Sequence, residues 1–393
     1  MDGEWAPRDP ASLSDEALRE RIAPAREVWR NVDRTIQDVP EPRLGPDQVM
    51  VQPKVTAICG SDFLRMEADA EGYMTHWSRC AFPIIAGHEV GGTVVEIGKN
   101  VKHLKVGDHV TTEVGNYCGR CRACHAGILS YCTNNRNLGS GVPGVFAEYV
   151  ALRARGCWRI DALRDRYASD EEMFEAASMT EPMATPYYDL MHRGGGFKPG
   201  EYLVFYMAGP KYWLQAELGI GLAKFAGAGK VIVVDMLDEG SPVRQQVYRE
   251  MGADHIIRVP DSAANGDDVA EQIMEFTHGD GADLYWENAD MLDQTLALTV
   301  ETMALGARFI QTAHTKTRHP LPLDQFRAKG GQIIASEGHI EPGTLGKCLR
   351  VMAAGVDVRP AITKRYQFDD LVEALRFGFT YRDGHVAIRM PGL

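Results

Sequence analysis

Four cysteines crowd into fifteen residues in the first half of the chain, in the pattern C-x2-C-x2-C-x7-C. Four thiolates on so short a stretch can surround one tetrahedral metal ion, and because they fill every position around it, such a site is structural. An iron–sulfur cluster is an alternative, but its usual spacing, with three residues before a last cysteine that precedes proline, is absent. Four unrelated thiols are a second alternative, which the clustering disfavours. The pattern predicts a structural zinc bound by Cys118, Cys121, Cys124 and Cys132.

The composition restricts the partners and the location of the protein. The 393 residues carry a formal net charge of −12, which argues against nucleic acid and anionic membranes because both would repel an acidic surface. No run of about 18 apolar residues is present, so no membrane-spanning helix is expected. The first residues, MDGEWAPRDP, are polar and lack the apolar core of a secretion signal. We therefore expect a cytoplasmic protein, in which clustered cysteines bind metal rather than form disulfides.

The spacing of apolar residues changes twice along the chain, whose length suits two domains. Residues 12–27 begin with serines and acidic residues, which predicts a short helix on an N-terminal extension, 1–27. Apolar runs such as VMVQPKVTAIC and GGTVVEIG then alternate with turn residues, as in a β-rich domain. After residue 202, YLVFY, KVIVVD and GADLYWE alternate with helical stretches, which predicts a doubly wound parallel sheet. The expected α/β fold has a first domain at 1–195, a second at 196–337 and a return to the first at 338–393.

A second set of metal-binding residue types is dispersed around the cysteine cluster. Cys59 stands in ICGSD, His88 and Glu89 stand in AGHE, and Glu181 stands in TEPMAT. Each residue alone is weak evidence for a metal site, since a lone histidine more often has a structural role and Glu-Pro usually starts a helix. Their order around the four-cysteine cluster gives them weight as a group.

Further motifs point to a known family: GHEVGGTVVEIG, VGDHV, GVFAEYV, EPMAT, KVIVVD and MGADHII. With CGSD and the cysteine cluster, they make the chain resemble the zinc-dependent medium-chain dehydrogenases of the alcohol dehydrogenase superfamily, over nearly everything after residue 28. It is most similar to the sorbitol, polyol and cyclitol (scyllo-inosose-type) branch, the cyclitol link resting on EGY, RGGG and ASEGH. The resemblance implies a GroES-like β-rich catalytic domain, a Rossmann domain, two zinc ions per chain and NAD.

The resemblance also implies roles for single residues. Asp62 would orient a ligating histidine, and Ser61 would take the substrate proton. Thr185, one helical turn after Glu181, would touch the nicotinamide. Where relatives have a histidine in CGSDxH the chain has Leu64, so the usual solvent end of the proton relay is missing. The implied ligands of the catalytic zinc are Cys59, His88, Glu89 and Glu181.

The nucleotide-binding segment departs most from the family. After YLVFY the family has G-x-G-x-x-G, whose glycines allow the turn and the approach of the pyrophosphate. Here the segment reads MAGPKY and keeps only Gly209. Lys211 would offset part of the loss by contacting the pyrophosphate, and Gly219 and Gly221 are candidates for displaced helix-packing glycines. Asp235 ends the second strand, where a carboxylate can accept the ribose hydroxyls of NAD and would repel the extra phosphate of NADP. The expected cofactor contacts are Thr185, Gly209, Pro210, Lys211 and Asp235.

The leading hypothesis is an enzyme that transfers a hydride between a secondary alcohol of a polyol, cyclitol or sugar derivative and NAD. One alternative is a redox-neutral epimerase or isomerase with retained NAD, or a zinc Lewis-acid enzyme with a degenerate nucleotide site. Another is a non-enzymatic protein stabilised by zinc. The expected partner is a small hydroxylated substrate, with Tyr73, His76 and Trp77 as candidate contacts, and the family implies a homodimer or homotetramer.

Overall fold

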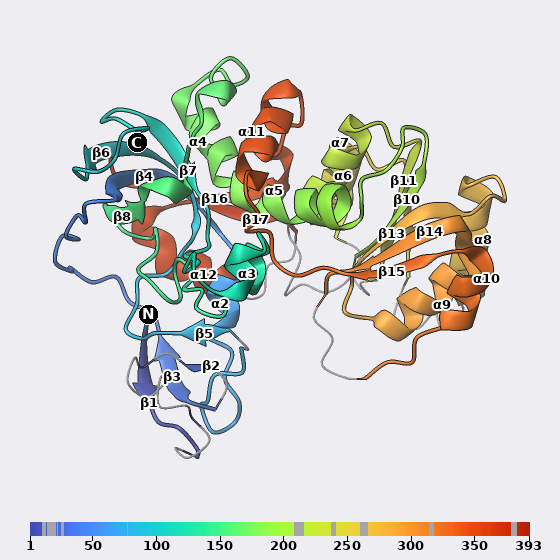
Figure 1. Cartoon of the computed structure of the whole chain (residues 1–393), viewed down its shortest axis with the longest axis horizontal. Helices are drawn as coiled ribbons and strands as arrows, with labels where there is room; N and C mark the ends of the chain where they lie inside the picture. The colour runs from blue at the N-terminus through green and yellow to red at the C-terminus, as the bar shows by residue number, and fades with distance from the viewer. Residues whose placement is uncertain are drawn as a thin grey trace.

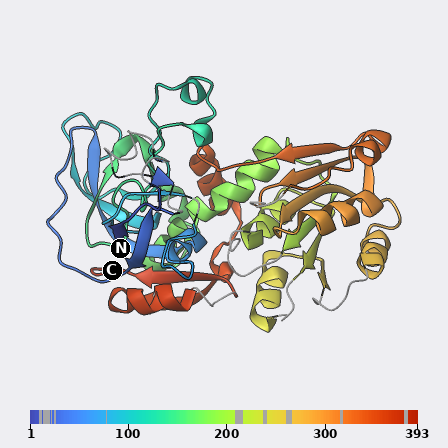
Figure 2. The ribbon, with the colours of Figure 1, turned by 90° about the horizontal axis from the view of Figure 1, so that it is seen from below.

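The computed structural model describes residues 1–9, 13, 21, 23–24, 27–76, 78–207, 216–236, 241–259, 266–313, 318–378 and 383–393. The chain forms two lobes, each built around its own sheet (Figure 1). The green helical segment between them, seen in both views, belongs to neither sheet (Figures 1 and 2).

A largely antiparallel sheet forms the centre of the first lobe. Its longest strand, β4 (Gln48–Ile58), pairs antiparallel with three others. Most of its side chains are buried, including Val49, Met50 and Val51, because other elements cover both faces of this strand. Two strands from the end of the chain belong to this sheet. The strand order is β16 (Ile362–Gln367), β17 (His385–Arg389), β4, β6 (Glu89–Ile97), β7 (His109–Thr112) and β9 (Cys157–Arg159), with β8 (Val150–Arg153) beside β4.

A parallel sheet forms the second lobe. Its strands are apolar on both faces because helices cover both sides, which explains their nearly continuous hydrophobic sequences. Helices α6 (Ala216–Phe225) and α7 (Pro242–Met251) pack on the face toward the first lobe. Helices α8 (Gly266–Phe276), α9 (Leu292–Thr302) and α10 (Leu323–Lys329) cover the other face. The strand order is β12 (His255–Arg258), β11 (Lys230–Asp235), β10 (Tyr202–Met207), β13 (Ala282–Asn288), β14 (Met303–Gln311) and β15 (Gln332–Ala335).

From β10 the sheet is extended toward one edge by β11 and β12, and from β13 toward the other edge by β14 and β15. Ligands of doubly wound sheets bind at the carboxyl ends of the strands where the order changes in this way, here between β10 and β13.

The division of the chain at residues 195 and 337 stays a prediction. The sets of strands that form the two sheets support it. Both lobes pack against α5 (Thr180–Pro186) and the π-helical turn η5 (Tyr187–Arg193). The remaining helices among the described residues are α2 (Gly60–Leu64), α3 (Arg122–His125), η2 (Leu129–Tyr131), η3 (Ala154–Gly156), η4 (Asp161–Leu163), α4 (Asp170–Ser178), α11 (Thr344–Ala354), η6 (Arg359–Ala361), η7 (Phe368–Asp370) and α12 (Leu371–Gly378).

The N-terminal extension adds two small sheets to the first lobe. Strand β1 (Asp2–Trp5) pairs with β3 (Trp29–Asp33), and β2 (Ala23–Pro24) pairs with β5 (Arg79–Cys80). Most of the helix expected at 12–27 lies outside the described residues. The predicted C-terminal end of this helix is wrong, because residues 23 and 24 are extended and pair with strand β5. Of the helices that the structure describes, none combines the length and the apolar character needed to cross a membrane.

Candidate active site

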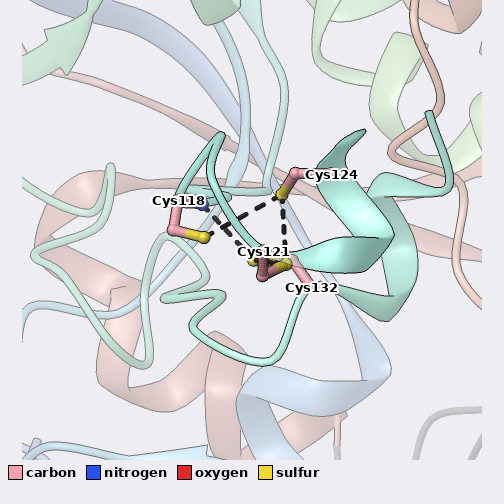
Figure 3. Close-up of side chains that lie close together, drawn as sticks. All are labelled: Cys118, Cys121, Cys124 and Cys132. Carbon is pink, nitrogen blue, oxygen red and sulfur yellow. Dashed lines mark hydrogen bonds between the residues drawn. The ribbon is translucent and has the colours of Figure 1, made fainter. Parts of the chain in front are cut away.

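The four clustered cysteines converge on one point (Figure 3). Their sulfur atoms all lie within 4.8 Å of one another, and none of these cysteines forms a disulfide. The sulfurs of Cys121 and Cys124 are 3.5 Å apart, and those of Cys121 and Cys132 are 3.8 Å apart. Thiolates about 2.3 Å from a tetrahedral zinc lie roughly 3.8 Å from one another. Backbone N–H donors lower the pKa of Cys121 to about 6, which favours the thiolate that binds metal.

The second metal-binding group is assembled by the register of two strands. Ala57 on β4 pairs with Glu89 on β6, so Cys59, which immediately follows β4, comes next to His88 and Glu89. The ligand atoms of Cys59, His88 and Glu89 lie within 4.8 Å of one another. Both His88 and Glu89 are buried, at 4% and 1% exposure. The three residues can hold a metal ion and leave part of its coordination sphere open.

Asp62 lies next to this group and contacts two of its members, Cys59 and His88. Its carboxylate accepts hydrogen bonds from the backbone N–H of Cys59 at 3.2 Å and from Arg65 at 3.1 Å. The same carboxylate lies 3.6 Å from Nδ1 of His88. Burial alone would raise the pKa of Asp62, but His88 and Arg65 outweigh it and lower the pKa. At 3.6 Å the contact between Asp62 and His88 is electrostatic, and Nδ1 of His88 has no hydrogen-bond partner in the described part of the chain. An ionised Asp62 beside Nδ1 favours the orientation in which Nε2 faces a metal.

The chemistry of the donors fits a metal ion. The Oε2 atom of Glu89 is buried and has no hydrogen-bond partner in the described part of the chain. Burial, with the neighbouring Cys59 thiol, raises the pKa of Glu89 well above its usual range. A buried carboxylate without a donor or cation is costly, and a bound metal would remove that cost.

Glu181 lies beside this group but outside it. Its Oε1 is 2.7 Å from Nε2 of His339, and Nδ1 of His339 is 3.1 Å from Oγ1 of Thr185. Both Glu181 and Thr185 come from α5, one turn apart. His339 was missed by the sequence reasoning as a site residue, although its ASEGH segment resembled the cyclitol branch. The ASEGH motif pointed to this segment, but it did not indicate a role for His339.

The other expected site residues are placed as follows. Ser61 is half-buried in the first turn of α2, two residues after Cys59. Leu64 is 2% exposed and packs in the core of the first lobe, so it takes no part in a relay. The Tyr73 ring packs under the guanidinium of Arg8 in the N-terminal extension, at 4.4 Å. His76 is buried and its Nδ1 lies 2.8 Å from the hydroxyl of Ser78. Trp77 lies outside the described residues.

The carboxyl ends of the strands in the second lobe present two polar features. The Asp235 carboxylate, at the end of β11, accepts from Arg244 at 3.1 Å, and both side chains are buried. Asn288, at the end of β13, is completely buried, and its side chain has no hydrogen-bond partner in the described part of the chain. It is on the same face of β13 as Trp286, which faces the first lobe. An unsatisfied amide at the point where the strand order reverses fits the carboxamide or ribose of a nicotinamide nucleotide.

The helix that follows β10 packs closely against the sheet. A Cβ atom on Gly219 would lie 2.4 Å from the ring of Trp286, and one on Gly221 would lie 2.7 Å from Met251. Gly219 therefore meets the steric requirement expected of a displaced packing glycine. Gly209, Pro210 and Lys211 lie outside the described residues, so their expected contacts stay predictions.

Comparisons with known proteins agree with this architecture. Residues 45–162 match the alcohol dehydrogenase GroES-like domain, and residues 217–341 match the zinc-binding dehydrogenase family. Scyllo-inosose 3-dehydrogenase from Thermotoga maritima is 32% identical over 389 residues, 96% of this chain and 95% of that protein. L-threonine 3-dehydrogenase from Pyrococcus horikoshii is 34% identical over 253 residues, 64% of this chain and 63% of that protein. The solved structure of a proposed alcohol dehydrogenase from Thermotoga maritima has a TM-score of 0.90 at 30% identity, covering 99% of this chain and 98% of that chain.

The predicted α/β fold, with a GroES-like domain and a Rossmann domain, is confirmed by these matches. The predictions of an enzyme, of zinc and of a nicotinamide cofactor are confirmed at the level of the family. The comparisons give no support to the epimerase or to the non-enzymatic alternative. The chain therefore belongs to the zinc-dependent medium-chain dehydrogenases and is an enzyme that oxidises or reduces an alcohol.

Proposed function

We propose that the protein transfers a hydride between a secondary alcohol of a polyol or cyclitol and NAD. The observation that carries the proposal is the convergence of Cys59, His88 and Glu89 within 4.8 Å, beside the buried carboxylate of Glu181. Similarity to a scyllo-inosose dehydrogenase along 96% of the chain supports a cyclitol substrate. A ring that carries several hydroxyl groups can bind through one oxygen at the metal and hydrogen-bond through others.

The proposed catalytic zinc supplies Lewis-acid chemistry, which lowers the pKa of bound water from 15.7 to about 7 in favourable sites and acts similarly on an alcohol. Cys59, His88 and Glu89 would hold it, and Glu181, the fourth group that the family resemblance implies, would lie beside them. Asp62 keeps His88 in the tautomer that leaves Nε2 free. His88 and the positive charge of Arg65, 3.1 Å away, hold the pKa of Asp62 below its usual value. Ser61, in the first turn of α2, is the proposed acceptor of the substrate hydroxyl proton.

NAD is proposed to lie across the carboxyl edge of the parallel sheet. Asp235 would accept the ribose hydroxyls of the adenosine, and Asn288 would face the nicotinamide end. Gly209, Pro210 and Lys211 are proposed for the pyrophosphate, and Thr185 for the nicotinamide. A cytoplasmic homodimer or homotetramer is part of the proposal.

The test combines metal counting with product analysis on the protein as purified. We expect two zinc ions per chain, of which Cys59→Ser loses one and Cys118→Ser loses the other. Cyclitols and linear polyols are then offered with NAD, and NADH is followed by absorbance while the organic product is identified. Turnover of a polyol with equimolar NADH supports the proposal.

Two outcomes would contradict it. Stereoisomers of the substrate formed without net NADH would point to an epimerase. One zinc per chain, unchanged by Cys59→Ser, would remove the catalytic metal from the scheme. The Cys118→Ser variant is the matched control because it tests loss of a thiol at the other cluster.

A further inference from the structure

The carboxylate of Glu181 is held by a residue that lies far away in the sequence. Nε2 of His339 is 2.7 Å from Oε1 of Glu181, and Nδ1 of His339 is 3.1 Å from the hydroxyl of Thr185. In the arrangement that satisfies every atom, the Thr185 hydroxyl donates to Nδ1, and Nε2–H donates to Glu181. His339 therefore bridges two residues on one face of α5, and it is largely buried, with 16% of its side chain exposed.

The segment that carries His339, residues 336–341, is anchored at both ends. Ser336 donates to the buried carboxylate of Asp189 on η5. On the other side, Glu341 accepts from the hydroxyl of Tyr188 at 3.4 Å. Because both η5 and α5 belong to one helical segment, these bonds fix His339 along the same surface that presents Glu181.

The short helix η2, which precedes Cys132 of the cysteine cluster, anchors the same segment from a second direction. The hydroxyl of Ser130 accepts from the backbone N–H of Ile340 at 3.1 Å, and the N–H of Leu129 donates to Glu341 at 3.4 Å. Both residues lie in η2, immediately before Cys132. The position of His339 is thus fixed by contacts with α5, η5 and η2. A residue on an unanchored loop would lack such contacts.

The direction in which Glu181 is held affects the metal centre. Cys59, His88 and Glu89 form a group within 4.8 Å that does not include Glu181. Helix α5, which carries Glu181, nevertheless packs against strand β6, which begins at Glu89. A nearby carboxylate without a partner would be a strong additional ligand, and a fourth protein ligand closes the position that a catalytic zinc leaves for substrate.

We propose that His339 is a positioning residue that holds Glu181 away from the metal, so that Cys59, His88 and Glu89 bind it and a coordination position stays available to the substrate oxygen. The inference rests on the proposed metal centre and adds a statement about Glu181 within it. Its carboxylate stays near the metal without being a permanent ligand. The inference also assigns the ASEGH segment, which the sequence pattern left without a role.

The experiment uses the full-length protein with cobalt in place of zinc, and 2-mercaptoethanol as an external ligand that loses its thiol proton to solvent and binds cobalt as a thiolate. Its binding is followed as the increase in sulfur-to-cobalt charge-transfer absorbance above that of the protein's own cysteine ligands. In His339→Ala, Glu181 is released onto the metal and competes with the thiol, and we expect thiol affinity to fall about tenfold or more, equivalent to about 1.4 kcal/mol. The double variant His339→Ala with Glu181→Gln should regain wild-type affinity, because a side-chain amide is a poor competitor for the metal.

Two isosteric variants keep the test valid if alanine disturbs folding. His339→Gln places an amide N–H near the position of Nε2 and should retain thiol affinity. His339→Asn reaches only the position of Nδ1 and should behave like alanine. Unchanged thiol affinity in both His339→Ala and His339→Asn overturns the inference, as does a loss that Glu181→Gln does not relieve.

Failure of the metal centre itself is recognised separately. If Cys59→Ser binds as much cobalt as the wild type, the proposed catalytic site is wrong, and the inference about His339 falls with it. If Cys59→Ser loses one cobalt and the His339 variants bind thiol normally, only the positioning role is wrong. Thermal midpoints and retention of the four-cysteine metal report folding in each variant.

Discussion

Arg244 on α7 donates to the carboxylate of Asp235 at the end of β11, at 3.1 Å, with both side chains buried. The pair combines, at the edge where the adenosine ribose is proposed to bind, the carboxylate that favours NAD and a guanidinium that can bind a 2′-phosphate. In the wild type each charge compensates the other. The carboxylate therefore has two effects: it can accept ribose hydroxyls, and it neutralises the arginine.

We predict that Asp235→Asn shifts cofactor preference toward NADP. The change removes the carboxylate that repels phosphate and takes away the negative charge that Asp235 places beside Arg244. The ratio of kcat/KM for NADP to that for NAD should rise about tenfold or more, equivalent to about 1.4 kcal/mol. Asp235→Glu keeps the charge and should leave the ratio near its original value. An equal shift in both variants would show that the charge of Asp235 does not set the preference.

Removal of the structural zinc is expected to lower the stability of the whole chain. Cys132→Ser breaks the closed four-thiolate site, so the protein should lose one zinc and unfold at a lower temperature. Zinc analysis and thermal denaturation measure the two effects. The buried Cys157, which lies near Thr112 and away from the cluster, supplies the control: Cys157→Ser should keep both zinc ions. A Cys132→Ser protein that retains its full zinc content would contradict the predicted site.

Gly219→Ala should destabilise the second lobe. The added methyl group would lie 2.4 Å from the ring of Trp286, which is fully buried and cannot move without disturbing β13. Overpacking of this kind costs about 1–3 kcal/mol. Gly156→Ala is the matched control, since its Cβ would meet nothing closer than 3.7 Å. Denaturant unfolding compares the two, and equal stabilities would mean that α6 can shift away from the sheet at little cost.

The buried carboxyl of Glu287 should make stability fall as pH rises. Burial raises the pKa of Glu287 to about 7, so between about pH 5 and pH 7 the folded state retains a proton that the unfolded state has lost. Folding is then weakened with rising pH, by on the order of 1.4 kcal/mol per pH unit for one full proton.

Glu287→Gln tests this relationship. The amide oxygen of the glutamine can still accept from the backbone N–H of Ala289, which in the wild type lies 2.9 Å from Oε1 of Glu287. The variant should be more stable than the wild type at pH 8, and the difference should narrow below about pH 5. Thermal midpoints measured across this range provide the comparison. A difference that is independent of pH would mean that Glu287 is ionised in the folded protein throughout.

Local sequence determined the parts of the site in which the ligands lie close together or follow a regular element. Cys118, Cys121 and Cys124 are so near in sequence that the loop itself brings their sulfurs together. The group of Cys59, His88 and Glu89 was also accessible, because its motifs stand at the ends of two apolar strands. Their antiparallel register, Ala57 opposite Glu89, then sets the distance.

Contacts between polar side chains of separate elements were decided by the tertiary structure alone. His339 meets Glu181 from a position 158 residues away in the sequence, and Arg244 reaches Asp235 across the start of a helix. Neither pairing leaves a period or a spacing in the sequence. Propensity and hydrophobic pattern specify which face of an element is buried, whereas the partner of a polar side chain depends on how separate elements pack, since a buried charge must find its complement wherever packing places one.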